Sequence, residues 1–177
     1  MLRKILLVLL LALIALIVFV AMQPAAFRIA RKTVVAAPPA AVFARVDDLH
    51  LWQDWSPWAK LDPAAKNTFS GAEKGTGAVF TWEGNNEVGK GTMTIEESVA
   101  PQRLRIRLDF ERPMKAVNHA HFTFTPEGNG TSVEWAMTGT NSFVGKAFGL
   151  VVDVDAMLGA QFDQGLTQLK SLVEAGK

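Results

Sequence analysis

The 177-residue sequence contains no cysteine and no tyrosine. Without cysteine there are no disulfides, no thiolate nucleophile and no cysteine-ligated zinc. Without tyrosine, one common proton donor of hydrophobic active sites is missing. Charge is also sparse: charged residues make up 20% of the chain and the net charge is +1, which argues against a nucleic-acid binder. The length allows one soluble domain with an appendage.

Catalytic and metal-binding signatures are missing as well. The sequence has no nucleophile-elbow, P-loop, dinucleotide-binding or metalloprotease motif. His119 and His121 are two residues apart on a predicted strand, so they share a face and have a spacing that can hold a metal. No third ligand is close in sequence, and their face is the solvent side of that strand. We therefore expect surface histidines, no metal and no cofactor.

Residues 5–22 form a long apolar run without charge. A run of about 18 residues is just long enough to cross a bilayer as a helix. A cleaved signal peptide is the alternative, but its apolar region is usually about 7–15 residues and is followed by a small-residue cleavage site. We expect residues 1–24 to be a single-pass membrane anchor and residues 25–177 to be one folded domain. The short basic leader, Arg3 and Lys4, favours an extracytoplasmic domain.

The C-terminal stretch from residue 141 to residue 174 has apolar residues spaced by three and four, which predicts a long amphipathic helix. Unbroken, it would span roughly 45–50 Å, which is more than a small sheet needs. A break near Gly149 or Gly159 is therefore expected. An interior glycine costs about 1 kcal/mol relative to alanine, so Gly159 and Gly165 indicate close approach to another element, with packing favoured over ligand contact.

Between these ends the pattern has period two, which predicts strands. A first strand is expected at residues 27–35, then a short helix at 40–49 and a tryptophan-rich helical or looped segment at 52–58. Six further strands with short connections are predicted at 67–70, 77–83, 89–99, 103–110, 118–126 and 131–140. Short connections imply antiparallel neighbours. One face of these strands is apolar, so the fold class is α+β, with an antiparallel sheet of about seven strands covered by the terminal helix.

Several short motifs along this order are similar to a known family. They are WxxWSPW at 52–58 with Asp62, GxxxGxG at 71–77, Trp82-Glu83-Gly84, GxGxM at 89–93, FxxP at 110–113, GTxVxWxMxG at 130–139 and GLxxLKxxxE at 165–174. Together they resemble the polyketide cyclase/dehydrase-type branch of the START-like (SRPBCC) superfamily. The resemblance implies a helix-grip fold, in which a curved sheet wraps around the C-terminal helix and leaves a deep apolar cavity for a hydrophobic small molecule or lipid. It implies no single reaction.

The cavity candidates are the inward-facing apolar residues of this arrangement. They are Trp55, Trp58, Phe80, Trp82, Met93, Ile95, Phe110, Phe124, Trp135, Met157 and Phe162. Binding pockets are lined mostly by such groups. For any one of these residues, packing in a solid core is the favoured interpretation. For the group as a whole we expect a cavity, and that expectation depends chiefly on the resemblance.

Three arginines alternate along residues 103–107, on the outer face of a predicted strand beside the two histidines. Near a membrane such a strip can meet anionic headgroups. We favour the simpler interpretation that the strip is a solvated face paired with Glu96, Glu97 and Asp109.

These observations favour a membrane-tethered, non-catalytic domain that binds a hydrophobic small molecule or lipid. An alternative is a cyclase- or dehydratase-type enzyme that uses Glu83 or Asp155 as a general base in a dry pocket, where burial would raise the pKa of the carboxyl. A third possibility is a sensor or scaffold that binds a protein through the basic strand face.

Overall fold

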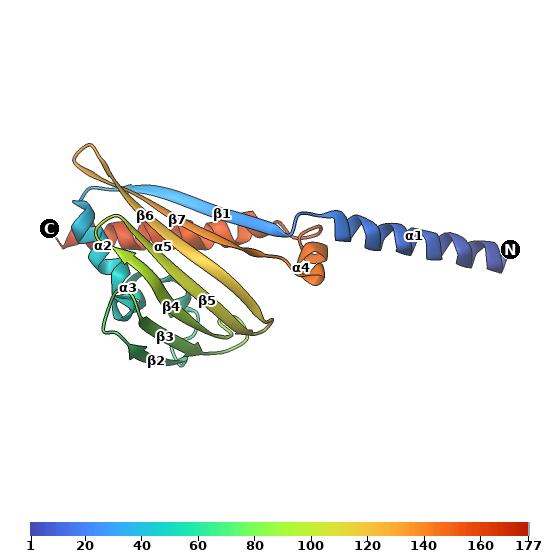
Figure 1. The fold of residues 1–177 in the computed structure, drawn as a ribbon, viewed down its shortest axis with the longest axis horizontal. Helices are drawn as coiled ribbons and strands as arrows, with labels where there is room; N and C mark the ends of the chain where they lie inside the picture. The colour runs from blue at the N-terminus through green and yellow to red at the C-terminus, as the bar shows by residue number, and fades with distance from the viewer. Residues whose placement is uncertain (177) are drawn as a thin grey trace.

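Seven antiparallel strands form one curved sheet in the order β1-β7-β6-β5-β4-β3-β2 (Figure 1). The computed structural model describes residues 1–176. The strands are β1 (Ala26–Val35), β2 (Lys66–Gly71), β3 (Ala78–Glu83), β4 (Lys90–Val99), β5 (Arg103–Arg112), β6 (Ala116–Glu127) and β7 (Gly130–Thr140). All seven predicted strands are present. β5 shows why alternating apolar and polar residues predict a strand here. Its leucines and isoleucine are buried, while the arginines between them are exposed.

Helical segments connect β1 to β2. Pro39 opens α2 (Pro39–Asp47), whose buried residues are Val42, Phe43 and Val46, as the sequence predicts. The tryptophan-rich segment is broken into η1 (Leu49–Leu51), α3 (Trp52–Trp55) and η2 (Pro57–Lys60). Because Ser56 and Pro57 interrupt it, this segment folds as separate short turns.

The C-terminal helical stretch is broken at the first of its two expected positions. α4 (Phe143–Phe148) ends at Gly149, and α5 (Val154–Ala175) begins after a short turn. The side chain of Ser142 accepts a hydrogen bond from Gly145 N, and that of Asp153 accepts one from Ala156 N. Each helix therefore has its own N-cap, and α5 continues through Gly159 without a break.

Close packing accounts for the two glycines inside α5. A Cβ added to Gly165 would lie 2.7 Å from Cζ3 of Trp135 on β7, and one added to Gly159 would meet the guanidinium of Arg31 on β1. α5 contacts β1 and β7, so both glycines let the helix approach the sheet. The prediction of packing roles is confirmed.

The N-terminal helix α1 (Leu2–Met22) projects away from the sheet (Figure 1). Its apolar side chains are largely exposed, and its length and composition would allow it to cross a membrane. A signal sequence has the same length and apolar character. Only residues 23–25 lie between α1 and β1.

Candidate ligand cavity

One part of the space between the sheet and the helices is filled by aromatic rings. Trp135 stacks on Phe162 of α5 with ring centroids 4.4 Å apart and on Phe122 with centroids 5.0 Å apart. Trp52 and Trp55 pack against this group, with 4.7 Å between their own centroids. These contacts form a solid core.

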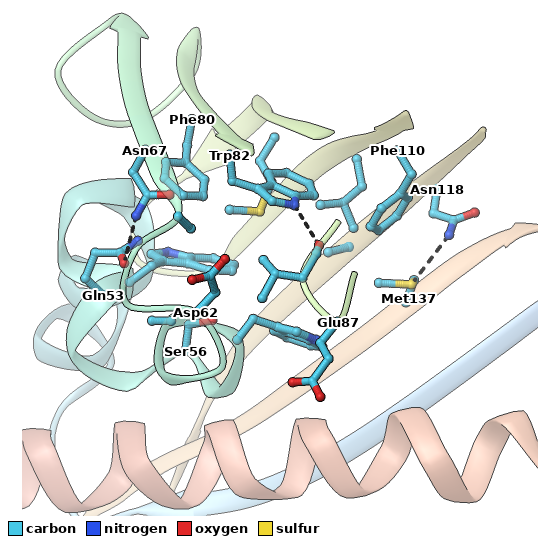
Figure 2. A pocket seen from close by; sticks show the side chains of 18 of the residues that line it. Gln53, Ser56, Asp62, Asn67, Phe80, Trp82, Glu87, Phe110, Asn118 and Met137 are labelled. Carbon is cyan, nitrogen blue, oxygen red and sulfur yellow. Dashed lines mark hydrogen bonds between the residues drawn. The ribbon is translucent and has the colours of Figure 1, made fainter. Parts of the chain in front are cut away.

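Beside the aromatic core lies a cavity of about 330 Å³. Its walls come from the inner face of β3 to β7, from the α3–η2 segment and from Leu158 of α5. Figure 2 shows Phe80, Trp82 and Phe110 on the strand side of this space and Gln53 and Ser56 on the side of the helical segment. The volume is at the lower end of the range for small-molecule sites, and apolar and aromatic walls are typical of them.

Six of the predicted cavity residues line this space, namely Trp58, Phe80, Trp82, Met93, Phe110 and Trp135. Four others, Trp55, Ile95, Phe124 and Phe162, are buried in the core next to it and do not line it.

Met157 does not occupy the predicted position. Its side chain is 54% exposed, while the next residue, Leu158, reaches the cavity. The inward stripe of α5 runs through Leu158, Phe162 and Leu166, spaced by four residues. Met157 is one residue, or about 100°, out of phase with that stripe, so its prediction as a cavity residue was wrong.

Polar side chains that were not among the predicted residues also line the cavity. Asn67 Nδ2 donates to Gln53 Oε1 at 3.3 Å, and Asn118 Nδ2 lies 3.7 Å from Met137 Sδ (Figure 2). Asn118 could have been predicted from the sequence. It is four residues from the inward-facing Phe122 on β6, and residues an even number apart on a strand point to the same face. Gln53 and Asn67 follow no periodic pattern that would have indicated them.

Asp62 joins two of the loops around the cavity. Its Oδ2 accepts a hydrogen bond from Asn85 N at 2.7 Å, and its Oδ1 accepts one from Ala64 N at 3.1 Å. The loop of residues 84–89 is further held by Trp82, whose Nε1 donates to the carbonyl of Val88 at 3.1 Å (Figure 2). Asp62 therefore has a structural role in the wall of the cavity.

The cavity lies toward the end of the sheet from which α1 projects. In an antiparallel sheet every second connection is at the same end. At this end Ala26, just after α1, pairs with Thr140, and the strand directions place the connections 61–65, 84–89 and 113–115 there too (Figure 1). All three connections contribute residues to the cavity wall.

The exposed members of the lining mark the mouth of the cavity. They include Glu87, Arg112 and Pro113. Two of the three carry opposite charges, so the entrance is polar at its rim and apolar within.

Neither of the two candidate general bases lines the cavity. Glu83 is exposed and forms ion pairs with Lys90 at 3.5 Å and Arg112 at 3.4 Å. Asp155 is exposed at the start of α5, where Arg31 lies 3.0 Å away. Hydrogen bonding from Arg31 lowers the pKa of the Asp155 carboxyl, which is opposite to the raised pKa expected of a base in a dry pocket.

The basic strip lies on the outer face of the sheet beside the histidines, as predicted. Arg105 is the register partner of His121, and Arg107 is the register partner of His119. The arginines are paired with Glu97, Glu96 and Asp109 at 2.7, 3.1 and 2.8 Å respectively. Their positive charge is thus largely neutralised locally. Within residues 1–176, no three His, Cys, Asp or Glu side chains are grouped to hold a metal ion.

Comparison with known families and structures agrees with this geometry. Residues 26–174 match the model of the family described as polyketide cyclase / dehydrase and lipid transport. No curated protein matches the chain.

Solved structures with the same fold include protein CV1439 from Chromobacterium violaceum, at 18% identity and a TM-score of 0.59, covering 86% of this chain and 99% of that one. The Aha1 dimer from Colwellia psychrerythraea has 15% identity and a TM-score of 0.61, covering 85% and 98%. Ara h 8.0201 has 13% identity and a TM-score of 0.60, covering 85% and 99%. At these identities the likeness establishes the helix-grip fold alone.

Proposed function

The chain belongs to the polyketide cyclase / dehydrase and lipid transport family, and we propose that it binds a hydrophobic small molecule or a lipid while α1 tethers the domain to a membrane. The observation that carries this proposal is the cavity, which has aromatic walls and a volume of about 330 Å³. Burial of an apolar ligand surface there would be favourable by roughly 25 cal/mol per Å².

The position of the cavity supports a link between the ligand and the membrane. Its mouth is formed by connections at the end of the sheet nearest α1. A domain tethered there presents its entrance toward the bilayer, where apolar molecules are concentrated. On this proposal α1 is the anchor, and the domain lies on the extracytoplasmic side.

Binding without catalysis is the version we favour. Asp62, a carboxylate of the cavity wall, accepts hydrogen bonds from two backbone amides. Because both of its oxygens are occupied by these bonds, the carboxylate is poorly placed to take a proton from a ligand. The outer basic strip supports a protein-binding role less well, because acidic neighbours pair with its arginines.

Quenching of tryptophan fluorescence by a brominated fatty acid tests the proposal on the purified full chain. Trp58, Trp82 and Trp135 line the cavity, so a bound bromine atom will quench their emission. Native mass spectrometry of the same sample will report any apolar molecule that copurifies. No quenching together with no copurifying molecule would overturn the proposal.

A variant that blocks the cavity sharpens this test. Ala120 on β6 is buried and lines the cavity, so Ala120→Phe will weaken binding about tenfold or more, or by at least ~1.4 kcal/mol. Thr123→Phe, on the exposed face of the same strand, is the matched control and will bind as the parent does. Equal affinity in both variants would place the ligand elsewhere.

A further inference from the structure

An exposed apolar surface follows the last strand of the sheet. It comprises Phe143, Val144, Phe148, Leu150 and Val151, on α4 and the turn after it, and we name it the α4 patch. Val144 is 62% exposed and Val151 is 82% exposed. Exposed apolar side chains that cluster on a folded domain indicate a contact site for a protein partner or a membrane.

The α4 patch is fixed to the base of α1. Asn141 N donates to Ala25 O at 2.8 Å, and Lys146 Nζ donates to Ala21 O at 3.0 Å. α4 contacts α1, and Val20, in the last turn of α1, is buried. Figure 1 shows α4 beside the point where α1 leaves the domain.

The length of α1 sets the depth of the patch. Its 21 residues extend about 31 Å at 1.5 Å per residue, close to the ~30 Å hydrocarbon thickness of a bilayer. If α1 spans the membrane, its last turn lies at the boundary between acyl chains and headgroups. Because Lys146 of α4 is bonded to Ala21, and Asn141 just before α4 is bonded to Ala25, the patch lies at that boundary as well.

We propose that the α4 patch lies in the interfacial layer of the bilayer as a second membrane contact beside α1. The inference rests on the proposed membrane tether. Interfacial segments bury apolar side chains at the acyl boundary, and lysines nearby extend their ammonium groups to the headgroups. The Nζ of Lys146 lies 3.0 Å from Ala21 O in the last turn of α1, so this ammonium group would lie at the level of the headgroups. With α1 spanning the membrane and the α4 patch in the interfacial layer, the domain could not rotate freely about its tether. The mouth of the cavity would then stay next to the lipid.

Single cysteines test this arrangement, because the natural chain has none. The full chain is reconstituted in lipid nanodiscs at one copy per disc, with a polarity-sensitive fluorophore on Val151→Cys. Phe19→Cys in α1 reports insertion of the tether, and Val34→Cys, 40% exposed near the far end of β1, is the negative control. Quenching is measured with lipids spin-labelled near the headgroup and with iodide in the water.

The expected result is strong lipid quenching at positions 19 and 151, none at 34, and several-fold weaker iodide quenching at 151 than at 34. Val144→Asp added to Val151→Cys will reverse the result at 151. Lipid quenching at 19 without any at 151 overturns the patch proposal and leaves the tether intact.

Two further outcomes also contradict the proposal. Shielding of 151 from iodide without lipid quenching would mean that protein covers the patch. Absence of lipid quenching at all three positions would mean that α1 does not insert, so the tether fails together with the patch. Ligand binding is measured separately by the bromine assay, so its result is not confused with either.

Discussion

The indole N–H of Trp82 on β3 donates to the backbone carbonyl of Val88 at 3.1 Å, which fastens the 84–89 loop to the wall of the cavity. Both residues line the cavity, so one bond links the shape of the apolar space to the loop at its mouth. The same loop is tied by Asn85 to Asp62 at 2.7 Å. These two bonds therefore hold the 84–89 loop in the wall of the cavity.

Removal of the indole bond is predicted to speed ligand exchange. Trp82→Phe deletes the donor, which will cost about 1 kcal/mol of stability, and will raise both hydrogen exchange in residues 84–89 and the ligand dissociation rate. Trp58→Phe, also in the cavity wall, is the control for lost ring volume. If the two variants exchange hydrogen in this loop equally, the bond does not govern the loop.

A methyl group at Gly165 is predicted to destabilise the fold. The added Cβ would lie 2.7 Å from Trp135 Cζ3 and 3.1 Å from Pro57 Cδ, and such overpacking costs about 1–3 kcal/mol. This exceeds the ~1 kcal/mol that alanine gains over glycine in a helix. Gly149→Ala, whose Cβ would have its nearest neighbour at 3.5 Å, is the control. Chemical denaturation will compare the two, and a stabilised Gly165→Ala would refute the packing argument.

Protonation of His121 is predicted to weaken the fold in mild acid. Burial, reinforced by the charges of His119, Arg105 and Arg28, lowers the pKa of His121 below its ordinary 6.5. The unfolded chain therefore binds the proton more readily, so the stabilisation is complete above pH 6.5 and is lost as the pH falls toward the lower folded value. His121→Gln will flatten the dependence of unfolding free energy on pH as the pH falls below 6.5.

The control for this pH series is Thr123→Gln, at an exposed position on the same strand as His121. It removes no titratable group, so it will keep the slope of the parent. A His121→Gln curve as steep as the parent curve would assign the pH dependence to another group.

Membrane topology is predicted to place the β6–β7 hairpin on the extracytoplasmic side. Asn129 in that hairpin is exposed, so Asn129→Cys will react with a membrane-impermeant maleimide on intact cells. Leu2→Cys, beside the basic leader, will react only after permeabilisation. The reverse labelling pattern would place the domain in the cytoplasm.

The sheet could be predicted because apolar and polar residues alternate along several of its strands. β5 and β7 have one buried face and one largely polar face, and side-chain period fixes that face from sequence alone. The break at Gly149 also followed from length and glycine position. These features are local, so no knowledge of neighbours was needed.

Features that depend on how a helix is rotated about its axis relative to the sheet were less predictable. Met157 and Leu158 are adjacent apolar residues of α5, and only Leu158 lies on the face that reaches the cavity. Trp55 and Trp58 were indistinguishable in a segment too short to show a period, and the structure buries the first in the core and places the second in the wall. The position of the mouth depends on the direction of every strand, which no single motif encodes.

The short connector of residues 23–25 has a mechanical consequence. β1 pairs with β7 along its whole length, from Ala26 with Thr140 to Val35 with Thr131. A force applied through α1 therefore pulls β1 lengthwise against β7, so the hydrogen bonds of that ladder share the load instead of opening one at a time. Tension from a moving or bending bilayer would thus meet the sheet in shear, the direction in which a pair of strands resists separation best.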